Sequence, residues 1–163
     1  MSSDLKITVL GLDGVGKSSF ILQFIENQFP SSPIPTKKEY YQKTLNIKGK
    51  DTNINILEVS SQEKTTNSRT DFMKDSDCFI IIFALDDKTS FDAVDNIFKE
   101  ISQYKNDELI MVYLCGNKSD VENRQITKIE ALNYCLDHKI FYFETSAKTN
   151  VGIQEFFSAE IDL

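Results

Sequence analysis

One eight-residue segment restricts the fold of this chain more than any other feature of its sequence. The segment covers residues 11–18, reads GLDGVGKS, and follows directly on a short apolar run at residues 7–10. Glycines at this spacing and a Lys-Ser pair, between a buried strand and a helix start, form the pattern of a phosphate-binding loop. Glycines let the backbone fold so that successive N–H groups point at one anion. The segment therefore predicts a strand, a loop and a helix built around a phosphate group.

The residue types in this segment suggest individual roles around that phosphate. Lys17 is expected to reach the β- and γ-phosphates of a nucleotide as a point charge, and the hydroxyl of Ser18 is expected to bind Mg²⁺. The positive end of the helix dipole adds to the attraction. The residues expected to hold the phosphates are Asp13, Gly14, Val15, Gly16, Lys17, Ser18 and Ser19. The alternative, a glycine-rich turn with a solvated lysine, is disfavoured by the strand that precedes it.

Short apolar runs alternate with helical patterns through the rest of the chain. Further strands are expected at residues 45–47, 54–57, 79–85, 110–115 and 140–143. Helices are expected where apolar residues share one helical face. The patterns are Ile21, Phe24 and Ile25; Phe91, Val94, Ile97, Phe98, Ile101 and Tyr104; Ile129, Leu132 and Leu136; and Phe156 with Phe157.

The order of these patterns predicts one α/β domain over residues 1–163. Nearly continuous apolar runs are typical of parallel strands that are buried on both faces. Residues 48–51, KGKD, predict a hairpin turn and therefore one antiparallel pair. We expect a mostly parallel six-stranded sheet with one antiparallel edge strand, flanked by about five helices. Two polar stretches, 28–39 and 60–74, show no periodicity and are expected to be functional loops.

Composition excludes several classes of function. A formal net charge of −7 and a pI near 4.7 argue against a general nucleic-acid or membrane-surface binder. Three cysteines beside apolar runs indicate buried thiols in a reducing compartment rather than disulfides. Without a leader pattern or a membrane-span pattern, we expect a cytoplasmic protein. We also expect a monomer. Membrane attachment is expected only if a lipidated tail is missing from this chain.

Two further loops follow strands at the edge of the sheet where ligands bind. Residues 116–120, GNKSD, follow the strand that ends at Cys115. The carboxylate of Asp120 can accept both N–H donors of guanine, whereas adenine would present a lone pair and repel it. Asn117 and Lys118 complete this loop, and a third loop follows the last strand with Ser146, Ala147 and Lys148. Asn-Lys-x-Asp alone is a weak signal, but three such loops in this order predict a guanine-nucleotide site.

These three loops, in this order and at these separations, resemble the Ras-like small GTPase superfamily and are closest to its Ras and Rab branches. The resemblance covers essentially the whole chain and implies a P-loop NTPase G domain that binds GTP or GDP with Mg²⁺. It implies that Phe29 lies against the guanine ring and that Thr36 joins the Mg²⁺ site in the first switch. Alternatively, Phe29 is a core aromatic at a helix end and Thr36 a solvated loop residue. Effectors, exchange factors and activating proteins would contact residues 28–40 and 60–74.

The second switch departs from the family pattern, which is Asp-x-x-Gly-Gln. Residues 58–62 read EVSSQ, so Glu58 keeps a carboxylate for the Mg²⁺ site but adds one methylene. Ser61 replaces a glycine whose N–H faces the γ-phosphate. Gln62 is retained and is expected to position the attacking water, with Lys17 as the other catalytic residue.

Asp13 is a further departure, because Ras proteins prefer glycine there. It either obstructs an arginine finger from an activating protein or stabilises the loop by an Asx contact. Because Glu58 and Ser61 replace the aspartate and glycine of the family, we expect a molecular switch with slow intrinsic GTP hydrolysis. The alternative is a non-hydrolysing GTP-binding scaffold. An ATPase or small-molecule kinase is disfavoured by Asn117 and Asp120.

Overall fold

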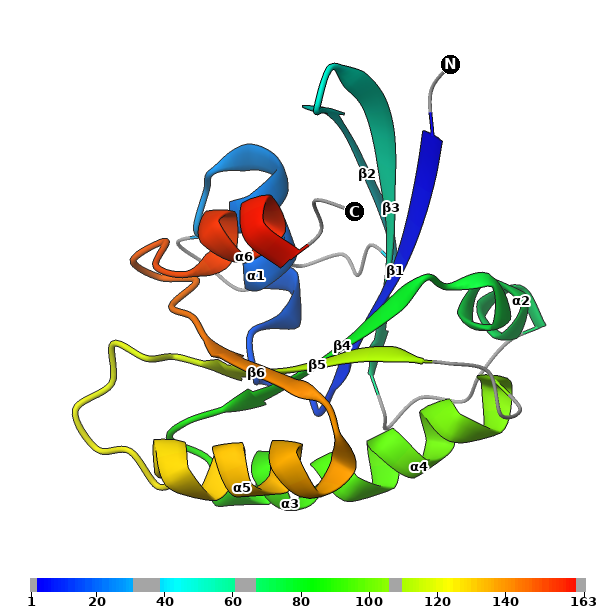
Figure 1. Cartoon of the computed structure of the whole chain (residues 1–163). Helices are drawn as coiled ribbons and strands as arrows, with labels where there is room; N and C mark the ends of the chain where they lie inside the picture. Colours follow the sequence, from blue (N-terminus) through cyan, green and yellow to red (C-terminus); the bar gives the residue numbers. More distant parts are fainter. Residues whose placement is uncertain (1–2, 31–38, 61–66, 106–109, 161–163) are drawn as a thin grey trace.

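The computed structural model describes residues 3–30, 39–60, 67–105 and 110–160. Figure 1 shows one twisted sheet with helices on both of its faces. The six strands lie in the order β2-β3-β1-β4-β5-β6. Their bounds are β1 Ser3–Gly11, β2 Tyr40–Ile47, β3 Lys50–Ser60, β4 Cys78–Ala84, β5 Met111–Asn117 and β6 Phe141–Glu144. Each strand overlaps an apolar run that the sequence analysis identifies, although β1, β2 and β3 begin four or more residues before their runs.

All neighbouring strands are parallel except β2 and β3. These two form a hairpin in which Ile47 pairs with Lys50, so its turn consists of Lys48 and Gly49. Both turn residues have positive φ, 52° and 79°, as a two-residue hairpin turn of the common type requires. The predicted hairpin is therefore confirmed, and β2 is the antiparallel edge strand of the mixed sheet.

Six helical segments lie in the described ranges. Their bounds are α1 Lys17–Glu26, α2 Asn67–Asp75, α3 Lys88–Asp92, α4 Val94–Lys105, α5 Lys128–His138 and α6 Ile153–Glu160. Only Ala93 separates α3 from α4, so the two count as one bent helical unit and the expectation of about five helices holds. None of the helices in these ranges is long and apolar enough to cross a bilayer.

Two apolar clusters cover the two faces of the sheet. One cluster combines α1 and α6 with residues such as Ile7 and Val9 of β1, and the other combines α2, α4 and α5 with Leu10 of the same strand. This division follows from the alternation of side chains along a strand. Every residue of β4, at the middle of the sheet, is buried.

The predicted buried face of α5 is wrong, although the helix itself is confirmed. Ile129 and Leu136 are 70% and 75% exposed, whereas Ala131 and Cys135 are buried. The small side chains of Ala131 and Cys135 let the helix backbone approach the sheet, which turns the larger aliphatic residues to the solvent. Apolar residues occur on both faces of this helix, so their spacing alone does not identify the packed face.

The stretch at residues 60–74 is not irregular throughout, because α2 begins at Asn67. This helix buries only Arg69 and Met73, so its sequence lacks an apolar stripe. The pattern across α3 and α4 is confirmed, with Val94, Ile97 and Ile101 all buried. All three cysteines are buried free thiols, as expected.

Candidate functional site

The predicted phosphate loop joins the end of β1 to the start of α1. Gly14 and Gly16 have φ of 87° and 95°, in the left-handed region that favours glycine. A Cβ on Gly16 would lie 2.5 Å from Nδ2 of Asn117, so a side chain at this position would also clash. Two glycines of the motif are therefore required by the backbone that the structure shows.

The N-terminus of α1 is open to an anion. Its N-cap is Gly16, which has no side chain to accept from the first N–H groups, and its first turn contains no carboxylate. Lys17 is 5% exposed, and its Nζ donates to the carbonyl oxygen of Leu12 at 2.8 Å. The ammonium group is thus held across the loop. Within the loop and the first turn of α1, Val15 is buried, Ser19 is half-buried and Asp13 is exposed.

Ser18 and Glu58 meet beside this loop. The hydroxyl of Ser18 donates to Oε1 of Glu58 at 2.6 Å and to Oε2 at 2.8 Å. Glu58 belongs to β3 and is 6% exposed. Hydroxyl and carboxylate oxygens are the ligands that Mg²⁺ takes in proteins, so this pair fits such a cation.

Tyr41 of β2 is a third member of this group, and the sequence motifs do not reveal it. Its hydroxyl donates to Oε2 of Glu58 at 3.2 Å. Burial and the neighbouring Glu58 carboxylate raise the pKa of Tyr41 to about 12, so at neutral pH it remains a donor. No motif marks Tyr41, because the contact depends on how β2 pairs with β3.

Asn117 connects the phosphate loop to the third loop. Its Nδ2 donates to the carbonyl oxygen of Val15 at 2.9 Å. Its Oδ1 accepts from the hydroxyl of Thr145 at 3.0 Å and from the N–H of Ala147 at 3.2 Å. Asn117 is only 2% exposed, so these bonds are shielded from water. One side chain therefore joins segments that follow β1, β5 and β6.

Asp120 and Ser146 link the other ends of the second and third loops. The hydroxyl of Ser146 donates to Oδ1 of Asp120 at 2.7 Å, while its oxygen accepts from the N–H of Thr149 at 3.1 Å. Lys118 has φ of 65° and its Nζ lies 4.0 Å from Oδ1 of Asp86. Asp120 itself is exposed, as is Lys148. The structure thus brings the predicted base-reading residues together.

An ion pair that the sequence motifs also leave unmarked braces the same loops. Arg124 donates from Nη1 and Nη2 to the two carboxylate oxygens of Glu144, at 3.1 Å and 2.6 Å. The hydroxyl of Tyr142 donates to Oε2 of Glu144 at 2.7 Å. Burial alone would raise the pKa of Glu144, but the hydrogen bonds from Arg124 and Tyr142 outweigh it and lower this pKa below its ordinary value. Glu144 is therefore held as a carboxylate.

The remaining predicted site residues lie apart from these contacts. Phe29 is 44% exposed, so the alternative of a core aromatic is wrong, and its place against a guanine ring stays a prediction. Thr36, Ser61 and Gln62 lie outside the described residues. Their roles at the metal and the γ-phosphate therefore also stay predictions.

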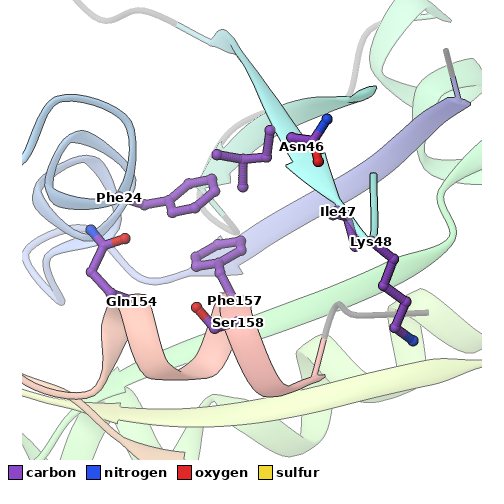
Figure 2. Close-up of a pocket in the computed structure, with 8 residues that line it drawn as sticks. Phe24, Asn46, Ile47, Lys48, Gln154, Phe157 and Ser158 are labelled. Carbon is purple, nitrogen blue, oxygen red and sulfur yellow. The ribbon is translucent and has the colours of Figure 1, made fainter. Parts of the chain in front are cut away.

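A cavity of about 370 Å³ lies between the β2–β3 hairpin and the helices α1 and α6 (Figure 2). Phe24 and Phe157 face each other at its wall, with ring centroids 3.5 Å apart. Its lining residues include none from residues 11–18, 116–120 or 144–148. This cavity is therefore separate from the site that the three loops form.

Comparison with known proteins gives one consistent result. A sequence model of the Ras family matches residues 6–162. The Ras-related protein R-Ras is 35% identical over 153 residues in both mouse and human, which is 93% of this chain and 70% of those proteins. The Ras-like protein RAS2 of Hydra vulgaris is 34% identical over 162 residues, 96% of this chain and 84% of that protein. The chain therefore belongs to the Ras family, and its fold is that of the small GTPase G domain.

Proposed function

We propose that this chain binds GTP and GDP together with Mg²⁺ and acts as a molecular switch with slow intrinsic hydrolysis. The observation that carries the proposal is the position of Asn117, whose one buried side chain joins the phosphate loop to the third loop. A ligand that contacts both loops would therefore bind to segments that Asn117 holds together. Ras-family membership supports GTP hydrolysis as the general activity.

The phosphates are assigned to the open N-terminus of α1. Backbone N–H groups from Asp13 to Ser19 would surround the β-phosphate, and the ammonium group of Lys17 would exchange the carbonyl oxygen of Leu12 for phosphate oxygens. This exchange replaces a neutral acceptor with a charged one. The side chain of Asp13 is exposed on the phosphate loop, where it would meet an incoming regulator.

The base is assigned to the second and third loops. Asp120 would accept the two N–H donors of guanine with its carboxylate, which Ser146 orients. A site built around such polar pairing rejects the wrong base strongly, because a mismatched base would cover the Asp120 carboxylate without pairing with it. Lys118, Ala147 and Lys148 complete this part of the site, and Phe29 would lie against the ring.

The metal is assigned to Ser18, Glu58 and Thr36, and bound Mg²⁺ would neutralise charge on the phosphates. Gln62 would orient the attacking water, while the backbone of Ser61 would meet the γ-phosphate. A side chain at Ser61, where the family has glycine, costs about 1 to 2 kcal/mol if the backbone there needs positive φ. This cost supports slow hydrolysis.

The second candidate is a non-hydrolysing GTP-binding scaffold. Glu58 favours it, because its side chain is one methylene longer than the family aspartate and already reaches the hydroxyl of Ser18. In either case we propose one cytoplasmic, monomeric domain over residues 1–163. Partner proteins would bind through residues 28–40 and 60–74.

The proposal is tested by identifying the nucleotide that co-purifies with the protein and by following GTP hydrolysis in a single turnover. We expect bound guanine nucleotide that excess ATP does not displace, and slow production of GDP. Lys17→Ala and Ser18→Asn should weaken binding or its Mg²⁺ dependence by about 1.5 to 3 kcal/mol each. If both variants bind GTP like the parent, the assignment of the phosphate loop is wrong. Measurable binding without any GDP production would favour the scaffold.

A further inference from the structure

The register of the β2–β3 hairpin places Tyr41 beside the predicted metal ligands. Tyr41 lies directly opposite Ile56, and Glu58 is two residues further along β3. Residues i and j±2 on one face of an antiparallel pair are close enough for long side chains to touch. Tyr41 and Ile56 both belong to the apolar cluster on the α1 side of the sheet, and Glu58 projects to the same side.

The two oxygens of Glu58 have different surroundings. Oε2 accepts from the hydroxyl of Tyr41 at 3.2 Å and from the hydroxyl of Ser18 at 2.8 Å, whereas Oε1 accepts from Ser18, at 2.6 Å, and not from Tyr41. Adjacent ligands of an octahedral Mg²⁺ at 2.0 to 2.1 Å lie about 2.9 Å apart. The Ser18 and Glu58 oxygens are therefore already near the spacing of two ligands of one cation. A hydroxyl oxygen that donates its proton to a carboxylate still has a lone pair for a metal.

We propose that Tyr41 is a positioning residue of the Mg²⁺ site, holding Oε2 of Glu58 so that Oε1 coordinates the cation directly beside Ser18. The inference rests on the proposed nucleotide and Mg²⁺ binding. It explains the extra methylene of Glu58 as the length that lets the carboxylate contact both Tyr41 and the cation. Because the Glu58 side chain is longer and Tyr41 anchors its Oε2, Oε1 reaches the cation without a bridging water. Partners that orient a metal ligand typically contribute 10- to 100-fold in metal affinity.

The test measures how nucleotide retention by the Tyr41→Phe variant depends on the Mg²⁺ concentration. Release of a fluorescent GDP analogue is followed at buffered free Mg²⁺ concentrations, in the parent and in the variant. We expect the Mg²⁺ concentration for half-maximal retention to rise about tenfold, the lower end of that range because the 3.2 Å contact is longer than an ideal O–H···O bond. In excess chelator, the two release rates should coincide, because the lost oxygen acts only through the metal.

A matched control is available elsewhere in the fold. The hydroxyl of Tyr134 donates to Oδ1 of Asp95, also at 3.2 Å, between α5 and α4. Tyr134→Phe removes the same atom from the same kind of contact and should leave the Mg²⁺ dependence unchanged. Thermal unfolding of each variant reports whether either substitution disturbs the fold.

Two measurements that use the Glu58→Asp variant distinguish a positioning role of Tyr41 from a general structural role. The shorter aspartate side chain would not bridge Tyr41 and the cation, so adding Tyr41→Phe should change the Mg²⁺ dependence by less than about threefold. The second measurement replaces Mg²⁺ with Mn²⁺ and uses the broadening of the Mn²⁺ electron paramagnetic resonance lines by ¹⁷O-labelled water. It should count one metal-bound water fewer in the parent than in Glu58→Asp. Equal water counts, or a Tyr41→Phe variant with the Mg²⁺ dependence of the parent, would overturn the inference while leaving nucleotide binding in place. A parent that binds no guanine nucleotide at any Mg²⁺ concentration would instead overturn the proposed function.

Discussion

Asn117 and Val15 are 102 positions apart in the sequence, and a hydrogen bond of 2.9 Å joins the side-chain Nδ2 of the first to the carbonyl oxygen of the second. The bond is buried, and the glycine that follows Val15 leaves the space that the amide occupies. We therefore expect nucleotide affinity and fold stability to be coupled at this position, because the same side chain also accepts from Thr145 and Ala147.

Asn117→Ala is expected to lower the free energy of unfolding by about 3 kcal/mol, because it leaves several buried polar groups without their partner at about 1 to 3 kcal/mol each. Guanine-nucleotide affinity should fall with it. Urea denaturation of the nucleotide-free protein measures the first effect. Asn133→Ala, at an exposed position of α5, is the control and should stay within about 0.5 kcal/mol of the parent. A loss below about 1 kcal/mol in Asn117→Ala would show that the loops are held by other contacts.

Asp120→Asn is expected to shift the base preference from guanine toward xanthine. An amide can donate to the additional carbonyl of xanthine, and its oxygen can keep the hydrogen bond from Ser146. Displacement of a bound fluorescent nucleotide by GDP and by XDP measures the shift. Asp137→Asn makes the same change at an exposed position of α5 and should leave the preference unaltered. Unchanged guanine preference in Asp120→Asn would refute the assignment of the base-reading carboxylate.

Reverting the second switch, Glu58→Asp with Ser61→Gly, is expected to raise single-turnover GTP hydrolysis at least about tenfold. One well-aimed N–H to the γ-phosphate contributes about 1.5 to 3 kcal/mol, which corresponds to roughly ten- to a hundredfold in rate. Adding Gln62→Leu should abolish the gain, since the water would lose the group that positions it. A parent that already hydrolyses GTP as fast as the double revertant would show that both replacements are tolerated, and the scaffold alternative would lose its main support.

Acid sensitivity is expected to depend on Glu144. Because Arg124 and Tyr142 lower the pKa of its carboxyl in the folded state, this group stabilises the fold above the ordinary carboxyl pKa. That contribution is lost as the pH falls from about 4.5 through the lower folded pKa. Glu144→Gln should therefore be about 1 to 2 kcal/mol less stable than the parent near neutral pH, and the difference should shrink below about pH 4.5. A difference that is the same at pH 3 and pH 7 would contradict this account.

The loops and strands of this protein could be predicted because their requirements are local. Gly14 and Gly16 adopt positive φ, and the Lys48-Gly49 turn does the same, so the residue types report the backbone directly. The continuous apolar run of β4 reports burial on both faces in the same way. These signals determined the order of elements, the mixed sheet and the positions of the three loops.

Contacts between distant segments were decided only by the tertiary structure. The packed face of α5 depends on how closely the helix approaches the sheet, which favours Ala131 and Cys135 over the larger Ile129 and Leu136. The contact of Tyr41 with Glu58 depends on the pairing register of β2 and β3. Short sequence patterns encode the conformation of neighbouring residues, whereas the side chains that meet across a sheet are set by the packing of the whole domain.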